Sequence, residues 1–143
     1  MRIFLKVLIV MLFCGCSSND GQSSSNQDVL GKWYYKGTKM GTNPILLYQH
    51  QCPSSKSYRD FLENGTIDDV SYAGDCSILD DSLASTWART NNVLTITEFS
   101  PETQFTVTFT YEIVSITDQE MQLKQTVVNP DSTIIYISYY TRT

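Results

Sequence analysis

The stretch QFTVTFTYEI, residues 104–113, decides the fold class of this chain. Aromatic and β-branched residues occupy every second position from Phe105 to Ile113, and threonine or glutamate fills the positions between them. Alternate side chains of a strand point to opposite faces, so this pattern predicts one buried and one solvated face. From Val29 onward the sequence has no convincing helical period, and the body is predicted to be all-β and antiparallel.

A hairpin with explicit turn chemistry lies upstream, at residues 86–96. Asn91 and Asn92 tolerate positive φ angles, which a two-residue type I′ turn requires at both central positions. Such a turn pairs Trp87 with Ile96 across the two strands. The sequence therefore predicts a tight antiparallel hairpin here.

A second hairpin surrounds Asn64 and Gly65. A two-residue loop would pair Leu62 with Ile67, whereas a three-residue loop with Gly65 in the left-handed region, as a bulge, would pair Phe61 with Ile67. We favour the second register, because it places the bulky aromatic side chain on the inner face.

Further strands are predicted at residues 31–37, 45–50, 119–128 and 132–141. The total is eight or nine short strands in roughly 115 residues. Sheets of this size hide their edges by closing into a barrel or by folding into a sandwich.

The first fifteen residues have the organisation of an export signal. Arg2 and Lys6 supply the positive charge, and the apolar residues 7–13 follow. This apolar run is shorter than the roughly 20 residues that a transmembrane helix needs. Residues 1–15 are therefore assigned to a signal peptide.

The end of this segment resembles the lipobox of bacterial lipoproteins, in which a cysteine is acylated and becomes the mature N-terminus. Cys16 is preceded by the small residue Gly15 and followed by Ser17, so Cys16 is the expected attachment point. Cys14 is a rival acceptor, but the bulky Phe13 before it suits cleavage badly. An ordinary secretory peptide cleaved nearby is the other alternative.

Residues 16–28 form a Ser/Asn-rich tether, and the globular domain is expected over residues 29–143. Loss of Arg2 and Lys6 with the signal leaves 8 basic and 15 acidic residues, so the net charge changes from −5 to −7. Acyl chains, not a basic patch, would then hold the protein at a membrane. The expected location is the cell envelope, on the outer membrane, facing either the periplasm or the surface.

This interpretation gives each of the four cysteines a role. Cys14 leaves with the signal and Cys16 carries lipid, so Cys52 and Cys76 remain in an oxidising compartment and are predicted to form a disulfide. A metal or redox site is the alternative. It is weakly supported, because there is no CxxC motif and the single histidine, His50, lies two residues from Cys52.

Several function classes are disfavoured by composition. A pI near 4.6 argues against binding nucleic acid through clustered basic charge. No nucleophile elbow or spaced catalytic triad occurs, so the protein is expected to be neither an enzyme nor a cofactor or metal protein. Carboxylates gather at Asp68-Asp69, Asp75 and Asp80-Asp81, and a calcium site is the alternative there to a solvated acidic loop.

Short motifs along nearly the whole body resemble the lipocalin-like domains of small lipoproteins from Bacteroidetes-type bacteria. The matching segments are Leu30-Gly31-Lys32-Trp33, the hairpin from Phe61 to Thr66, Trp87, residues 92–96, Tyr111-Glu112-Ile113 and Met121-Gln122-Leu123. The resemblance implies an up-and-down barrel of eight or nine strands. It also implies that Trp33 of the G-x-W motif closes one barrel end, with Arg142 stacked on its ring.

The resemblance further implies a non-enzymatic binding role with a small apolar ligand. Side chains expected to line a cavity are Trp87, Phe109, Tyr111 and Tyr136. The alternative is that these residues fill the core of a short barrel, which would then act structurally or recognise an envelope protein.

Lipidation of Cys16 has a direct test. The Cys16→Ala variant is expected to lose [3H]palmitate labelling in vivo, because the acylated thiol is gone. Cys14→Ala serves as the matched control and should keep the label. Labelling that survives in Cys16→Ala would refute the assignment.

Overall fold

A computed structural model describes residues 28–79 and 83–143 of the chain. The predicted signal peptide 1–15, Cys16 and the tether as far as residue 27 lie outside these ranges, as do Asp80 and Asp81. The strands are β1 (Gly31–Met40), β2 (Leu46–Leu47), β3 (Tyr58–Phe61), β4 (Thr66–Tyr72), β5 (Ile78–Leu79), β6 (Ala84–Thr90), β7 (Val93–Ser100), β8 (Phe105–Ile116), β9 (Glu120–Asn129) and β10 (Ser132–Thr141).

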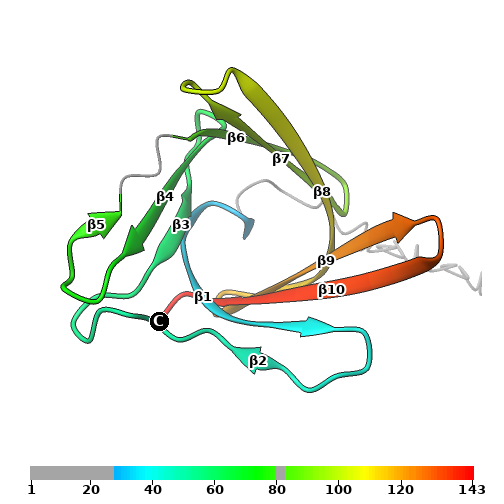
Figure 1. Cartoon of the computed structure of the whole chain (residues 1–143), viewed down its shortest axis with the longest axis horizontal. Coiled ribbons are helices and arrows are strands. Elements are labelled where there is room, and N and C mark those ends of the chain that lie inside the picture. Colours follow the sequence, from blue (N-terminus) through cyan, green and yellow to red (C-terminus); the bar gives the residue numbers. More distant parts are fainter. Residues whose placement is uncertain (1–27, 80–82) are drawn as a thin grey trace, which may run out of the picture.

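Eight of these strands form a closed antiparallel barrel in the order β1-β3-β4-β6-β7-β8-β9-β10, and β10 returns to pair with β1 (Figure 1). The predicted all-β barrel is confirmed. The two-residue strands β2 and β5 are additions that pair with β1 and β4 outside the closed ring. Closure satisfies the backbone groups that open sheet edges would expose.

The hairpin between β6 and β7 has the predicted register, with Trp87 opposite Ile96. Its turn differs in type. Asn91 has a φ of 54°, but Asn92 is not among the residues with positive φ, and a type I′ turn requires positive φ at both. The pairing is set by the alternation of the strands, which leaves the turn free to choose its geometry.

The hairpin between β3 and β4 follows the favoured alternative. Phe61 pairs with Ile67, and Gly65 has a φ of 82°. The Gly65 amide donates to the Leu62 carbonyl at 3.0 Å, which closes the turn. Phe61 is only 1% exposed, so the bulge does place this ring inside the barrel.

The predicted strand at 45–50 is mostly wrong, because only Leu46 and Leu47 pair with a neighbour. Gly31–Tyr34 pair with β3 on the same edge of β1, and β2 pairs farther along that edge with Gly37 and Thr38. The other predicted strands agree with the structure within a few residues, and 132–141 agrees at both ends.

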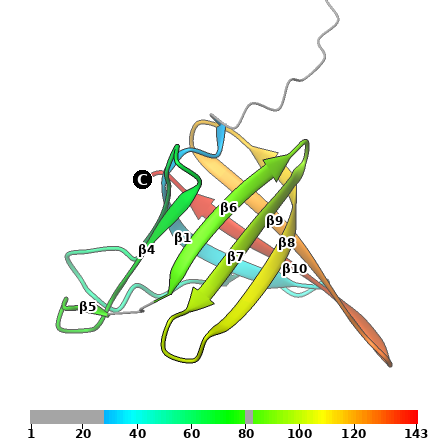
Figure 2. The same cartoon turned by 90° about the horizontal axis from the view of Figure 1, so that it is seen from above.

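Apolar side chains fill one end of the barrel. This core consists of Val29, Trp33, Phe61, Ile67, Trp87, Leu94, Ile96, Ile113, Met121, Leu123 and Tyr140. The start of β1 and the C-terminal end of β10 both lie at this end, as Figure 2 shows from the side. We call it the closed end.

The closed end is sealed by Arg142, whose guanidinium lies 4.1 Å from the centre of the Trp33 ring. Its Nη2 donates to the carbonyls of Leu30 at 2.9 Å and Asp28 at 3.2 Å. Gly31 has a φ of +95°, and a Cβ there would lie 2.9 Å from Arg142 Nη1. Glycine is therefore required by both backbone conformation and close approach.

The opposite end of the barrel is open. Along the inward face of β8, exposure rises from 2% at Ile113 through the half-buried Tyr111 and Phe109 to 64% at Phe105. The β7–β8 and β9–β10 hairpins extend beyond the core at this end (Figure 2). No helix among the described residues is long and apolar enough to cross a membrane.

A disulfide joins Cys52, in the segment between β2 and β3, to Cys76, in the turn between β4 and β5. The predicted pairing is present. It links two segments outside the barrel that form few sheet hydrogen bonds with it. In the chain-entropy model, closing a loop of this size stabilises the folded protein by roughly 3–4 kcal/mol.

The seal at the closed end predicts a stability effect. Arg142→Ala should lower the free energy of unfolding by about 2 kcal/mol, because it removes a cation–π contact and leaves two carbonyls without their donor. Lys39→Ala, which removes an equal charge from β1, should change it by less than about 0.5 kcal/mol. Urea unfolding followed by tryptophan fluorescence measures both, and equal losses would contradict this role of Arg142.

Candidate functional site: the polar layer inside the barrel

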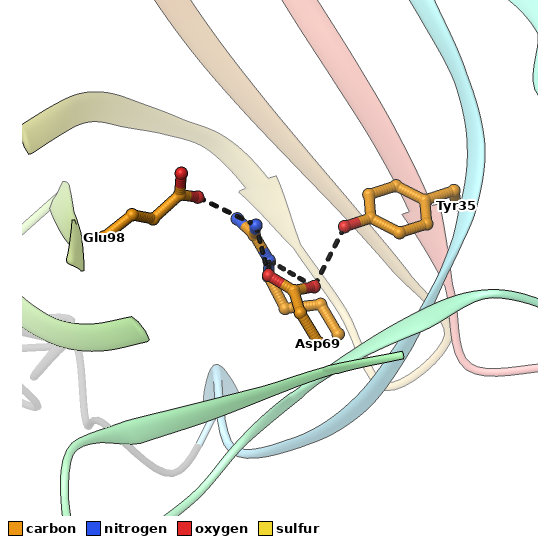
Figure 3. Close-up of polar contacts among 4 residues, drawn as sticks. Tyr35, Asp69 and Glu98 are labelled. Atoms are coloured by element: carbon orange, nitrogen blue, oxygen red, sulfur yellow. Dashed lines mark hydrogen bonds and ion pairs between the residues drawn. The ribbon is translucent and has the colours of Figure 1, made fainter. Parts of the chain in front are cut away.

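Four polar side chains lie close together inside the barrel, next to the apolar core in sequence, and Figure 3 shows their contacts. The Arg59 guanidinium binds the Asp69 carboxylate through two nitrogens, with Nε–Oδ2 at 2.9 Å and Nη2–Oδ2 at 2.5 Å. The Tyr35 hydroxyl donates to Asp69 Oδ1 at 3.0 Å. Glu98 Oε1 lies 3.3 Å from Arg59 Nη2. We call these four residues the polar layer.

Strand alternation positions every member of the polar layer. Each lies two residues from a core side chain on its own strand and so shares that inward face. Tyr35 follows Trp33 on β1, Arg59 precedes Phe61 on β3, Asp69 follows Ile67 on β4 and Glu98 follows Ile96 on β7.

Sequence reasoning missed the polar layer, although the period-2 pattern that identified the core also predicts these positions as inward. Asp69 was instead grouped with the acidic stretch as part of a solvated loop or calcium site. That interpretation is wrong for Asp69, which is bound by Arg59, while the neighbouring Asp68 is exposed on the opposite face. Among the described residues no group of three or more acidic, histidine or cysteine side chains is arranged to hold a metal ion.

Burial makes this layer electrostatically distinctive. Arg59 is only 9% exposed, and a charge so placed is stabilised only when paired and hydrogen-bonded. Burial alone would lower the pKa of Arg59, but the hydrogen bonds to Asp69 and the nearby negative charges raise it above its ordinary value. The guanidinium therefore stays charged inside the barrel.

Three tyrosine hydroxyls surround the charged groups and remain protonated. Burial raises the pKa of Tyr140 to about 12. Burial likewise raises the pKa of Tyr35 and of Tyr111, and the neighbouring Arg59 opposes the shift without cancelling it. The polar layer thus comprises one guanidinium and two carboxylates, a formal charge of −1, with neutral phenols beside them.

The residues predicted to line a cavity separate into two groups. Trp87 lies in the apolar core, 9% exposed, with its ring 5.6 Å from Phe61 and its Nε1 donating to the Leu62 carbonyl at 3.0 Å. Phe109 and Tyr111 are half-buried on the inward face of β8, where Phe109 pairs with Ile96.

Tyr136 is half-buried on β10, and it shares the inward face of Tyr140 because four residues separate them without a bulge. Phe109, Tyr111 and Tyr136 therefore lie on the inner surface between the core and the open end, where we call them the aromatic wall. The structure brings these three together with the polar layer, which sequence reasoning had not connected to them.

A pocket of about 250 Å³ adjoins the polar layer beside Tyr35 and Tyr140. Tyr48 closes over it, with its ring 5.4 Å from that of Tyr35, which is itself 5.4 Å from Tyr140. Hydroxyl-bearing Thr38 and Ser138 complete the wall. A planar molecule with hydrogen-bonding groups would find both ring faces and hydroxyls here.

His50 holds the segment that carries Tyr48. Its Nδ1 accepts a hydrogen bond from the Ser57 amide at 3.1 Å, so the proton resides on Nε2, which donates to the Tyr35 carbonyl at 3.1 Å. Burial lowers the pKa of His50 and favours this neutral form. His50 therefore connects the segment that carries Tyr48 to the backbone of Tyr35 and Ser57.

Comparison with known proteins supports the fold. A solved structure of apocrustacyanin C2, a lipocalin, matches with a TM-score of 0.56 and 14% identity, over 85% of this chain and 64% of that chain. The barrel is lipocalin-like. The chain spans less than two thirds of the crustacyanin chain it matches. No protein-family model and no curated protein sequence matches this one.

The buried pair at the centre of this lipocalin-like barrel predicts a large, asymmetric effect. Asp69→Asn should lower the free energy of unfolding by about 3–5 kcal/mol, because it removes the two-nitrogen ion pair of the buried Arg59 charge and leaves it only the single 3.3 Å contact with Glu98. Asp68→Asn, on the exposed face of the same strand, should cost less than about 0.5 kcal/mol. Chemical denaturation of both variants compares them, and similar losses would rule out a special role for the buried pair.

Proposed function

We propose that this protein is a lipid-anchored, non-enzymatic binding protein of the cell envelope that takes a small amphipathic molecule into the open half of its barrel. The acyl chains on Cys16 would hold it at the outer membrane, and residues 16–28 would act as the tether. The observation that carries the proposal is the polar layer, which lies between a solid apolar core and the partly exposed aromatic wall.

The gradient of exposure indicates how deep a ligand could enter. Residues below the polar layer, such as Leu94 and Ile96, are fully buried and leave no exposed surface to contact. Above the layer the inward side chains are half-exposed, so a ligand that covered them would bury apolar surface. An apolar body would rest on the aromatic wall, with its polar end against Glu98 and the phenols.

The charges of the polar layer favour one kind of polar end. Arg59 already donates to two carboxylates, those of Asp69 and Glu98. Among the described residues, the one hydrogen bond to the Glu98 carboxylate is that from Arg59, at 3.3 Å. A further anion would face a site of net negative formal charge. An ammonium or hydroxyl donor would instead complete the hydrogen bonding of Glu98.

The test is calorimetric titration of the full-length protein with three aromatic probes of similar size. 2-Phenylethylamine should bind more tightly than 2-phenylethanol, and 3-phenylpropionate should bind most weakly. Glu98→Gln should weaken the amine about tenfold and leave the alcohol nearly unchanged, because it removes the charge that pairs with the ammonium. Glu112→Gln, on the outward face of β8, is the matched control.

A barrel that binds none of the three probes would refute the carrier proposal. That result would favour the second candidate, recognition of an envelope protein. Its supporting observation is that the short strands β2 and β5 present apolar side chains to solvent, with Leu46 79%, Leu47 62% and Ile78 64% exposed.

A further inference from the structure

A second, separate site is indicated on the outside of the barrel, next to the closed end. A groove of about 430 Å³ lies between β1, β3, the segment before β3 and the C-terminal residues. Its volume falls in the range of small-molecule sites, about 300–1,000 Å³. Three cations line it, Lys32, Lys56 and Arg142, and no aspartate or glutamate belongs to its described lining.

The distribution of charge makes this groove exceptional in an acidic protein. Eight lysines and arginines lie within residues 28–79 and 83–143. Four of them have a carboxylate of the described residues within 4 Å; these are Lys36, Arg59, Arg89 and Lys124. The other four are Lys32, Lys39, Lys56 and Arg142, and three of these four line the groove.

Each of the two groove lysines has its ammonium over an aromatic ring. Lys32 Nζ lies 3.8 Å from the centre of the Tyr58 ring, although Asp60 is its partner in the strand register. Lys56 Nζ lies 5.7 Å from the centre of the Tyr34 ring. A cation held over a ring face keeps its charge and its donors available to an anion.

The groove is also built on fixed backbone. Lys56 lies four positions after Cys52, which is held by the disulfide. The next residue, Ser57, donates a hydrogen bond from its amide to His50 Nδ1. Arg142 is held over Trp33 by the contacts that seal the barrel. Thr143 also lines the groove. The three positive charges therefore come from three separately anchored segments.

We propose that this groove binds a phosphate monoester. Such a group carries about −1.5 to −2 charges at pH 7 and three acceptor oxygens, so it can pair with three convergent cations, which a single carboxylate cannot. Hydroxyls of Ser55 and the neighbouring tyrosines suit the polar body that bears the phosphate. The site is independent of the barrel interior and of any ligand held there.

The experiment is an NMR titration of the 15N-labelled full-length protein with two phosphate monoesters. Glucose 6-phosphate represents a soluble sugar phosphate, and dihexanoylphosphatidic acid represents a lipid headgroup. Saturable shifts centred on residues 32–34 and 54–58 with either probe support the site, and the probe that binds identifies the source of the phosphate. Unphosphorylated glucose is the neutral control.

Matched variants distinguish binding in the groove from non-specific attraction of the phosphate to positive charge. Lys32→Gln and Lys56→Gln should each weaken the binding probe at least about threefold, and together about tenfold. Lys39→Gln removes the fourth unpaired cation, outside the groove, and should change affinity less than twofold. Lys56 is exposed, whereas Lys32 and Lys39 are half-buried, so thermal melting of each variant is measured alongside and should shift little. The proposal is overturned if neither phosphate binds, if glucose binds equally, or if Lys39→Gln weakens binding as much as the groove variants.

Discussion

The rest of the structure depends on the pairing of β10 with β1, which joins the two ends of the domain and closes the sheet. Without it, β1 and β10 would each present an edge of unpaired backbone groups, and the inner faces of all eight strands would lose their common interior. The pairing also places Arg142 over the Trp33 ring. The strand that closes the sheet therefore also positions the residue that seals one end of the barrel. Among the described residues, the opposite end has no comparable seal.

Closure creates an enclosed interior, and the polar layer shows how that interior is divided. Below it, eleven buried side chains pack as a solid core. At its level, the Arg59 guanidinium pairs with the Asp69 and Glu98 carboxylates. Each of these charges would be costly to bury without a partner. Above it, aromatic side chains are only half covered. The buried ion pair therefore marks the boundary between the part of the barrel that stabilises the fold and the part that remains accessible.

Much of this could be predicted from alternation alone. The period-2 pattern of residues 104–113 runs along most of β8, the Phe61–Ile67 register follows from the Asn64-Gly65 turn, and the Trp87–Ile96 register follows from the alternation of the two flanking strands. These features are local, because strand pairing across a short turn involves residues close in sequence. The short strand β2 was not predictable in this way, since the sequence pattern of residues 45–50 does not show that only Leu46 and Leu47 pair with β1.

By itself, the sequence determined the all-β fold class and the hairpin registers, because these depend on alternation and turn chemistry, and it predicted the Cys52–Cys76 pairing. Only the tertiary structure decided which inward polar residues meet. Arg59 and Asp69 come from one hairpin, but Glu98 and Tyr35 reach them from strands on either side of it. The same holds for the groove, where residues 32, 56 and 142 converge. Such contacts depend on how the strands are arranged around the barrel. A local sequence pattern does not show which strands distant in sequence will lie close together.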